Sequence, residues 1–278
     1  MKNYIFCLLA IVLFSCSPKE QVQTFMTYNL RYNNPNDGEN RWEVRKENVA
    51  DLILNYQPDV FGTQEGLNDQ ITWLDSVLTN YSYIGVGRDD GKQKGEYCAI
   101  FYKTAKYNVI KQSTFWLSKT PEEISVGWDA ALERICTYFL LENKETKQRF
   151  YVFNAHFDHV GNIARLNSSK LIFSKITEHN PENYPCVLMG DLNLLPETDP
   201  ILYLSMQMDD SKGLAGESVS GAEGTFNGFK HDKTVTDRID YIFISKGDAK
   251  VKEYKVIDDQ VEERYPSDHL PVLVEVEL

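Results

Sequence analysis

The stretch that most constrains the fold runs Phe150-Tyr151-Val152-Phe153-Asn154-Ala155-His156-Phe157-Asp158-His159. Its first half is apolar and aromatic, which is typical of a buried β-strand. Its second half is polar and carries two of the five histidines of the chain. Polar side chains follow strand-like segments at four other places, namely Asn29, Gln64-Glu65, Asp191 to Asn193 and Asp240. Because strand ends hold side chains rigidly, we expect the five clusters to converge on one site.

Around this stretch the chain alternates between short strands and helices. Apolar residues recur at helical spacing from about Trp42 to Tyr56, from Leu67 to Leu78 and between Gly161 and His179. Strands are expected at 22–28, 59–65, 134–141, 150–155, 186–189, 239–245, 251–257 and 272–276, with more between 81 and 117. Strands outnumber helices, and short turns join many of them. The pattern predicts a mixed α/β or α+β fold around antiparallel sheets.

The composition is that of one globular domain, which we expect to be a monomer. The chain has 278 residues and a formal net charge of −12. Proteins that hold duplex DNA usually gather Lys and Arg on one face, whereas the basic residues here are scattered. The charge therefore disfavours a general DNA-binding enzyme, although acidity also serves solubility alone. Cys98, Cys136 and Cys186 lie in apolar segments and are expected to be buried free thiols.

The N-terminus predicts export. Lys2 precedes a short apolar run from Ile5 to Phe14, which is too short for a permanent membrane span and is typical of a secretion signal. The run ends in Leu13-Phe14-Ser15-Cys16, which resembles a bacterial lipobox; a plain signal peptide that contains a cysteine is the alternative. We expect a lipoprotein signal peptide over 1–16, a tether over 17–23 and a catalytic domain over 24–278. Lipidated Cys16 would anchor the exported protein at the cell envelope, on the outer membrane or the cell surface.

The polar clusters contain the residue types that metal-assisted hydrolysis of a phosphate ester needs. Hard divalent cations bind oxygen ligands, often one or two carboxylates with water completing the shell. Glu65, Asp191 and Asp268 offer carboxylates, and Asn29 and Asn193 offer amide oxygens. His156 and His269 are available for acid–base chemistry. Taken singly, each of these residues is as easily explained as a helix cap, a loop charge or a turn.

In their order along the chain, the clusters resemble the endonuclease/exonuclease/phosphatase superfamily. The resemblance extends from about Thr24 to the C-terminus. The segments that carry it are Tyr28-Asn29, Gln64-Glu65, Asn154-Ala155-His156-Phe157-Asp158-His159, Gly190-Asp191-Leu192-Asn193, Arg238-Ile239-Asp240-Tyr241-Ile242 and Ser267-Asp268-His269-Leu270-Pro271-Val272. It implies an α+β fold, a four-layer α/β/β/α sandwich of two mainly antiparallel sheets with helices outside.

The resemblance also implies a chemistry, in which a metal ion assists attack of water on phosphorus. The cofactor is expected to be Mg²⁺, with Mn²⁺ as the alternative. By matched position Glu65 is the principal metal ligand, with Asn29 and Asp268 beside it.

The other matched residues would have catalytic roles. Asp191 would activate or orient the water, and Asn193 would hold that carboxylate or the phosphate. Asp240 would orient and charge His269, which would contact the phosphate. His156 would protonate the leaving group. Which group acts as the base is argued over within the family.

Three more residues are candidates for binding the substrate. Arg134 matches a phosphate-contacting arginine of related nucleases, and a surface strand charge is an equal alternative. His159 would line the cleft or face solvent. Asn227 follows Phe226 where relatives place substrate-facing groups, although packing of Phe226 in the core is at least as plausible.

These observations predict a metal-dependent phosphodiesterase or phosphatase that acts outside the cytoplasm. The acidity favours small or lipid-linked phosphoesters over DNA. A secreted nuclease acting on DNA or RNA is the first alternative. A non-catalytic binding module is the second, and the intact set of polar residues argues against it.

Overall fold

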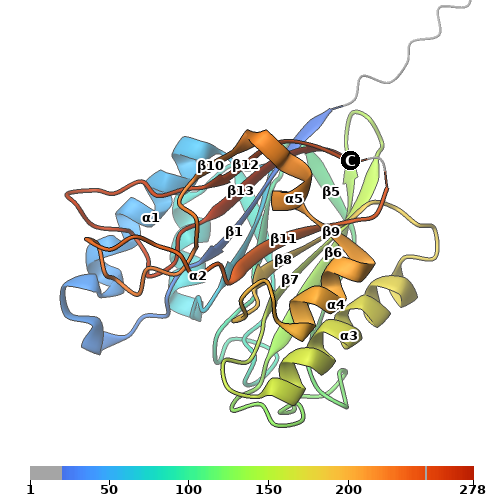
Figure 1. Ribbon diagram of the computed structural model, residues 1–278, viewed down its shortest axis with the longest axis horizontal. Helices are drawn as coiled ribbons and strands as arrows, with labels where there is room; N and C mark the ends of the chain where they lie inside the picture. Colours follow the sequence, from blue (N-terminus) through green and yellow to red (C-terminus); the bar gives the residue numbers. More distant parts are fainter. Residues whose placement is uncertain (1–20, 248) are drawn as a thin grey trace, which may run out of the picture.

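The computed structural model describes residues 21–247 and 249–278. Two β-sheets pack face to face, and helices cover the outer face of each (Figure 1). This confirms the four-layer α+β sandwich. The predicted signal peptide and most of the predicted tether lie outside the described residues. The first strand begins at Val22, earlier than the predicted domain start at Thr24, because Val22 and Gln23 already pair with the last strand of the sheet.

The first sheet has the strand order β10-β12-β13-β1-β2-β4-β3, and the second has the order β5-β6-β7-β8-β11-β9. Neighbouring strands are antiparallel except in three parallel pairs, β1 with β2, β10 with β12, and β7 with β8. The strands are β1 Val22–Asn29, β2 Val60–Gln64, β3 Tyr81–Ile84, β4 Ile100–Lys103, β5 Tyr107–Trp116, β6 Ile135–Asn143, β7 Arg149–His156, β8 Cys186–Asp191, β9 Met208–Asp210, β10 Val219–Gly221, β11 Asp240–Ser245, β12 Lys250–Val256 and β13 Val272–Glu277.

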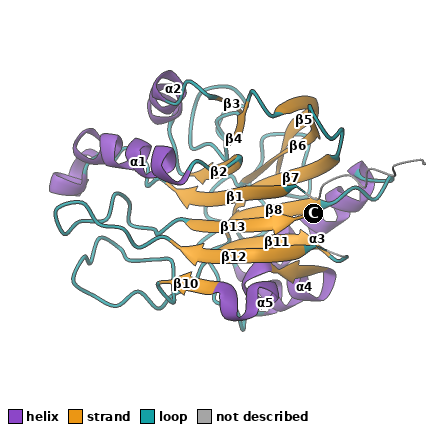
Figure 2. Ribbon diagram, turned by 90° about the horizontal axis from the view of Figure 1, so that it is seen from above, coloured by secondary structure: helices purple, strands orange, loops and turns teal. Residues whose placement is uncertain are grey.

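Helices α1 and α2 cover the first sheet, and α3 and α4 cover the second (Figures 1 and 2). The helices are α1 Trp42–Tyr56, α2 Asn68–Val77, α3 Asn162–His179, α4 Asp199–Gln207 and α5 Ser211–Ala215, with 3-10 turns η1 Pro35–Asn40 and η2 Gly216–Ser218. No helix in the described part of the chain is long and apolar enough to cross a membrane.

The hydrophobic core has one layer between the sheets and one beneath each pair of helices. Side chains alternate between the two faces of a strand. In β7, therefore, Phe150 and Val152 lie between the sheets, while Tyr151 and Phe153 pack with Ile172 of α3. The three cysteines are buried and free, as the sequence predicted.

Strand direction explains why the polar clusters meet at one end of the sandwich. His156 pairs with Asp191 across the parallel strands β7 and β8, and Asn29 pairs with Gln64 across β1 and β2. Asp240 begins a strand instead of ending one. It reaches the same edge because β11 runs antiparallel to β8, which places it opposite Asp191.

A buried amide joins the two sheets just below this edge. Asn154 of β7 donates to the backbone carbonyls of Thr63 and Ala99 and accepts from Gln64 at 2.6 Å. A Cβ on Gly62 would lie 2.6 Å from the Asn154 amide carbon, so the close approach requires glycine there. The polar clusters therefore stand on a rigid base.

Candidate active site

The polar clusters line one cleft of 530 Å³ at the end of the two sheets. Its lining contains most of the residues predicted for the site, together with residues that the sequence did not single out. The lining residues are Arg31, Tyr32, Glu65, Glu96, Leu132, Arg134, His156, His159, Asp191, Asn193, Phe226, Ile239, Asp268 and His269.

Glu65 lies just beyond the end of β2 with a left-handed backbone, φ 61°. Non-glycine residues seldom adopt this conformation, and those that do gather at functional sites. One carboxylate oxygen accepts from the Asn29 amide at 3.1 Å, and the other accepts from the backbone N–H of Tyr32 at 3.2 Å. The backbone therefore turns Glu65 into the cleft, and these two contacts hold it there.

Asp191 occupies the centre of the site and is almost fully buried. One oxygen accepts from the Asn29 amide at 2.9 Å, and the other accepts from the backbone N–H of Asn193 at 2.9 Å. Burial raises the pKa of Asp191, and the neighbouring Asp240 raises it further, while the two nearby histidines lower it. A cation beside Asp191 would therefore stabilise its deprotonated form.

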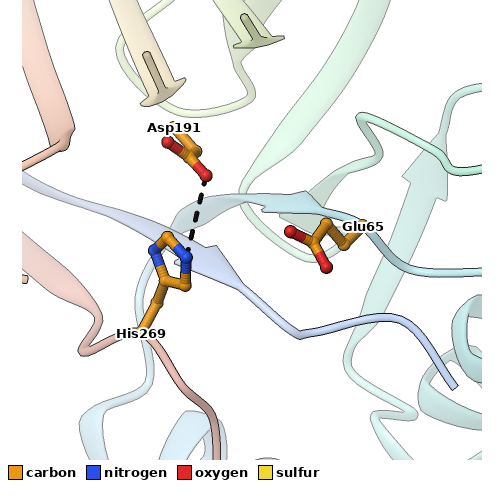
Figure 3. Close-up of side chains that lie close together, drawn as sticks. All are labelled: Glu65, Asp191 and His269. Carbon is orange, nitrogen blue, oxygen red and sulfur yellow. Dashed lines mark ion pairs between the residues drawn. The ribbon is translucent and has the colours of Figure 1, made fainter. Parts of the chain in front are cut away.

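His269 and Asp240 form a tight pair behind Asp191. The Nδ1 atom of His269 lies 2.9 Å from an Asp240 carboxylate oxygen, and its Nε2 atom points to Asp191 at 3.8 Å (Figure 3). Burial alone would lower the pKa of His269, but Asp240 and Asp191 outweigh it and raise the pKa well above its ordinary value. The imidazole is therefore positively charged at neutral pH.

His156 has the opposite surroundings on the other side of Asp191. The Arg134 guanidinium lies 3.0 Å from its Nδ1 atom and 3.1 Å from its Nε2 atom, and the Asn193 amide lies 3.2 Å from Nε2. Burial and Arg134 lower the pKa of His156 to about 3. The ring is neutral at pH 7 in these surroundings, and its role towards the leaving group stays a prediction. A neutral imidazole accepts a hydrogen bond and orients its donors.

Arg134 is buried, which excludes the reading as a surface strand charge. It contacts the Asp158 carboxylate at 3.4 Å and His159 Nδ1 at 2.9 Å, and both Arg134 and His159 line the cleft. The side chain of Arg134 is therefore held by three neighbours, with its charge at the cleft wall. That placement is suitable for contacting a phosphate.

Phe226 takes the substrate-facing alternative, whereas Asn227 supports the loop beside it. Asn227 is buried, and its side chain donates to the Ser267 carbonyl and accepts from the Phe229 N–H, so it supports the loop that carries Asp268 and His269. Phe226 is not a core residue, because 40% of it is exposed and it lines the cleft. The turn at Asn227 determines where both side chains lie, and the periodicity of the sequence does not show such a turn.

Glu96 is the principal site residue that the sequence analysis missed. It lies in the loop between β3 and β4, where its carboxylate is 3.5 Å from His156 Nδ1 and 4.0 Å from Arg134, and it accepts from Arg88 at 2.6 Å. Glu96 does not belong to any polar cluster after a strand. No signal in the sequence connects it with His156, because only the tertiary fold brings this loop to β7.

The residues present fit a divalent cation. Ligand atoms of Glu65, Asp191 and His269 lie within 4.8 Å of one another (Figure 3). The charged His269 is a poor ligand, because a metal needs the neutral imidazole. Its place beside the carboxylates is that of a countercharge.

Oxygen donors therefore carry the fit. Glu65, Asp191 and Asp268 are carboxylates. The Asn29 NH2 group donates to Glu65 and Asp191 and so joins two of them, while its Oδ1 accepts from the backbone N–H of Arg31 at 2.9 Å. Oxygen donors of this kind suit Mg²⁺ or Mn²⁺. None of these site residues is a cysteine, which is a ligand that zinc often has.

The family model of the endonuclease/exonuclease/phosphatase family matches residues 26–269, which include every cluster described above. The chain belongs to this family. Its members hydrolyse phosphoesters and use divalent metals, so the chain is a metal-dependent phosphoric ester hydrolase.

Solved structures of family members superpose closely. A mannosyl-6-phosphatase from Bacteroides thetaiotaomicron VPI-5482 is 38% identical, with a TM-score of 0.87 over 92% of this chain and 100% of that chain. A family protein from Bacteroides vulgatus is 37% identical, with a TM-score of 0.88 over 93% of this chain and 99% of that chain. These likenesses confirm the fold along nearly the whole described chain.

Curated relatives are more distant. The CCR4-NOT transcription complex subunit 6-like-A of Xenopus laevis is 24% identical over 208 residues, which are 59% of this chain and 38% of the relative. An uncharacterised protein of Acanthamoeba polyphaga mimivirus is 25% identical over 55% of this chain and 59% of its own length. The matches cover less than two thirds of the length of each relative, so the similarity concerns the catalytic fold.

Proposed function

We propose that this protein is a Mg²⁺-dependent phosphatase that removes phosphate from a small phosphorylated molecule, with a sugar phosphate as the substrate class. The observation that carries the proposal is the charge and size of the cleft. A cavity of 530 Å³ suits a small molecule. Its lining has two arginines and no lysine, against four carboxylates. One phosphate held by Arg134 and a metal fits this balance better than a polyanion does.

A relative supports the same class. The mannosyl-6-phosphatase that matches this chain is covered along its whole length, at 38% identity. Its name describes removal of phosphate from a sugar, which is a small phosphomonoester. Similarity to Ccr4 proteins that are named as 3'-5'-exoribonuclease subunits of the CCR4-Not complex favours a nuclease as the second candidate. The net charge of −12 and the acidic cleft lining argue for the phosphatase.

Each residue of the site has its own role in the proposed hydrolysis. Glu65, with Asn29 and Asp268, would hold the Mg²⁺, which supplies charge neutralisation at the phosphate when bound. Asp191 orients the attacking water, and the Asn193 N–H fixes the direction of that carboxylate. The His269 imidazolium, charged by Asp240, stabilises negative charge on the phosphoryl oxygens. Arg134 holds the phosphate from the opposite wall.

The experiment is a phosphate-release panel with purified protein and Mg²⁺ or Mn²⁺. Substrates are mannose 6-phosphate, glucose 6-phosphate, an inositol phosphate, sphingomyelin, a phosphodiester, RNA and plasmid DNA. We expect sugar phosphates to have the highest kcat/KM. The Asp191→Asn variant should lose this activity, and the matched surface variant Asp75→Asn should keep it. Faster cleavage of RNA or DNA would replace the proposal with the nuclease.

We also propose that the protein is exported and anchored to the envelope through Cys16. The support is the lipobox-like Leu13-Phe14-Ser15-Cys16 of the sequence. In a bacterial host the wild-type chain should fractionate with membranes, and Cys16→Ser should appear in the soluble fraction. The variant Cys98→Ser, changed at a buried thiol, is the control and should stay with the membranes. Cys16→Ser that remains bound after a salt wash would refute the lipid anchor.

A further inference from the structure

A second cavity of 220 Å³ lies beside the active-site cleft, and Phe226 lines both. Its other walls come from the loop between β10 and β11, chiefly Lys230, Thr234, Thr236 and Asp237. The two cavities therefore share one aromatic side chain as a partition. A molecule that extends from the phosphate past Phe226 would enter the second cavity.

Phe226 is a fixed partition despite its exposure. Its backbone N–H donates to the Asp237 carbonyl at 3.0 Å and it forms an isolated bridge with His269. Its ring meets the His269 ring edge-on at 5.0 Å. Gly228 lies under the ring with φ 56°, and a Cβ there would lie 3.4 Å from the ring. An exposed aromatic ring in a fixed position provides an apolar surface for stacking at low entropic cost.

The far wall carries solvent-exposed polar side chains. Within the described ranges, the side chains of Lys230, Thr234, Thr236 and Asp237 make no hydrogen bond to another residue. Lys230 donates, Asp237 accepts, and a threonine hydroxyl does both. Sugar hydroxyls donate and accept as well, so this set complements a ring that carries several of them.

The charges of the second cavity do not favour another phosphate. Lys230 and Lys233 are opposed by Asp237, and Lys233 already pairs with Asp232 at 3.2 Å. A neutral, hydroxyl-rich group therefore fits better than an anion.

We propose that this cavity is a subsite for a second sugar unit, joined to the unit that carries the scissile phosphate. The inference rests on the proposed phosphatase function and extends it. The substrate is then a phosphorylated saccharide of at least two units, and Phe226 separates the phosphorylated ring from its neighbour.

The test compares mannose 6-phosphate with mannose disaccharides phosphorylated on O6 of one unit. For the wild-type enzyme we expect kcat/KM to be about tenfold higher for a disaccharide phosphate, since two hydrogen bonds are gained. Thr236→Val, which keeps the volume and removes the hydroxyl, should lower this ratio about threefold to tenfold. Lys230→Met should lower it about threefold, because the other hydrogen bond is lost. Lys170→Met, on the exposed face of α3, is the control and should keep the wild-type ratio.

A binding measurement keeps the test independent of turnover. Unphosphorylated mannobiose should shift the backbone amide signals of Thr234 and Thr236 in the wild-type protein, and less so in Thr236→Val. Equal kcat/KM for both substrates, with no shift of these signals, would refute the subsite and leave the phosphatase intact. An enzyme that hydrolyses other phosphoesters but no sugar phosphate would refute the proposed substrate class and the subsite together.

Discussion

The two histidines of the active site have opposite electrostatic surroundings although Asp191 lies between them. His269 has Asp240 at 2.9 Å on Nδ1, and the carboxylates raise its pKa well above the ordinary value. His156 has Arg134 within 3.1 Å, and burial together with that guanidinium lowers its pKa to about 3. Both rings are almost fully buried, so burial alone does not separate them. Their charged neighbours do.

This difference assigns different roles to the same residue type. In the proposed mechanism, an imidazolium that is charged at neutral pH would neutralise the phosphate and stabilise the transition state. A neutral His156 adds no positive charge beside Arg134, whose guanidinium lies 3.4 Å from Asp158 and 4.0 Å from Glu96. The site therefore has cationic groups on both sides of Asp191, with His269 on one side and Arg134 on the other, and Arg31 also lines the cleft.

The largest expected effect comes from breaking the charged pair. Asp240→Asn leaves His269 without the carboxylate that charges it, and kcat should fall by about 10³-fold or more, by analogy with other carboxylate–imidazole pairs. His269→Ala should cost a similar factor, and the double variant should cost little more than either single change.

The measurement for the pair is a double-mutant cycle on kcat, with Asp210→Asn as the control. Asp210 pairs with Arg238 at 2.6 Å, away from the cleft lining. Its loss should leave kcat near the wild-type value. Fully additive losses for Asp240→Asn and His269→Ala would show that the two residues act independently.

A smaller effect is expected from removing the cation beside His156. Arg134→Met keeps much of the side-chain length and removes the charge, so kcat/KM should fall by about 10²-fold with the loss of a charged phosphate contact. The pKa of His156 should rise at the same time, while that of His269 stays high. Histidine ring NMR over a pH series measures both. An unchanged pKa of His156 would mean that burial alone lowers it.

The smallest effect is on stability, and the two histidines should give opposite signs. The folded-state pKa of His156 lies below its unfolded value near 6.5, so its contribution is present above that pH and is lost as pH falls toward about 3. The folded-state pKa of His269 is raised, so its contribution is present below about pH 6.5 and is lost as pH rises through the folded value.

Denaturant unfolding in chelator, at pH 4 to 8, measures this contrast. From pH 6 to 4 the free energy of unfolding of the wild type should fall by about 1.4 kcal/mol per pH unit relative to that of His156→Gln. Relative to that of His269→Gln, the free energy of unfolding of the wild type should fall only as pH rises above neutrality. Parallel pH profiles for the wild type and His156→Gln would contradict a depressed pKa in the folded protein.

The sequence allowed much of the site to be predicted, because its residues end or begin strands that share one edge. Asn29 and Asp191 end their strands, and Glu65 follows its strand directly. The pairing of β1 with β2 brings Asn29 to Glu65, and the packing of the two sheets brings Asp191 to Asn29. Elements with strong periodicity, such as α1 and α3, were also predicted close to their observed bounds.

Two kinds of feature could not be predicted. The elements between residues 199 and 221 have three to nine residues each, which is too few for periodicity to show. Residues on long loops form the other group. Glu96 reaches His156 only through the folded loop after β3, and the protonation states of the histidines depend on such neighbours. The local sequence pattern shows neither these short elements nor the contacts that long loops make in the folded protein.

The central claim is that phosphate release depends on a divalent metal held by Glu65, and one titration tests it most directly. Enzyme treated with chelator is assayed for phosphate release as Mg²⁺ is restored, for the wild type and for Glu65→Gln. The wild type should be inactive in chelator and recover fully. Glu65→Gln should fold normally and need about 10- to 100-fold more Mg²⁺ for half-maximal rate, a loss at least as large as that of an outer-shell partner. Full activity of the wild type in excess chelator would contradict the account.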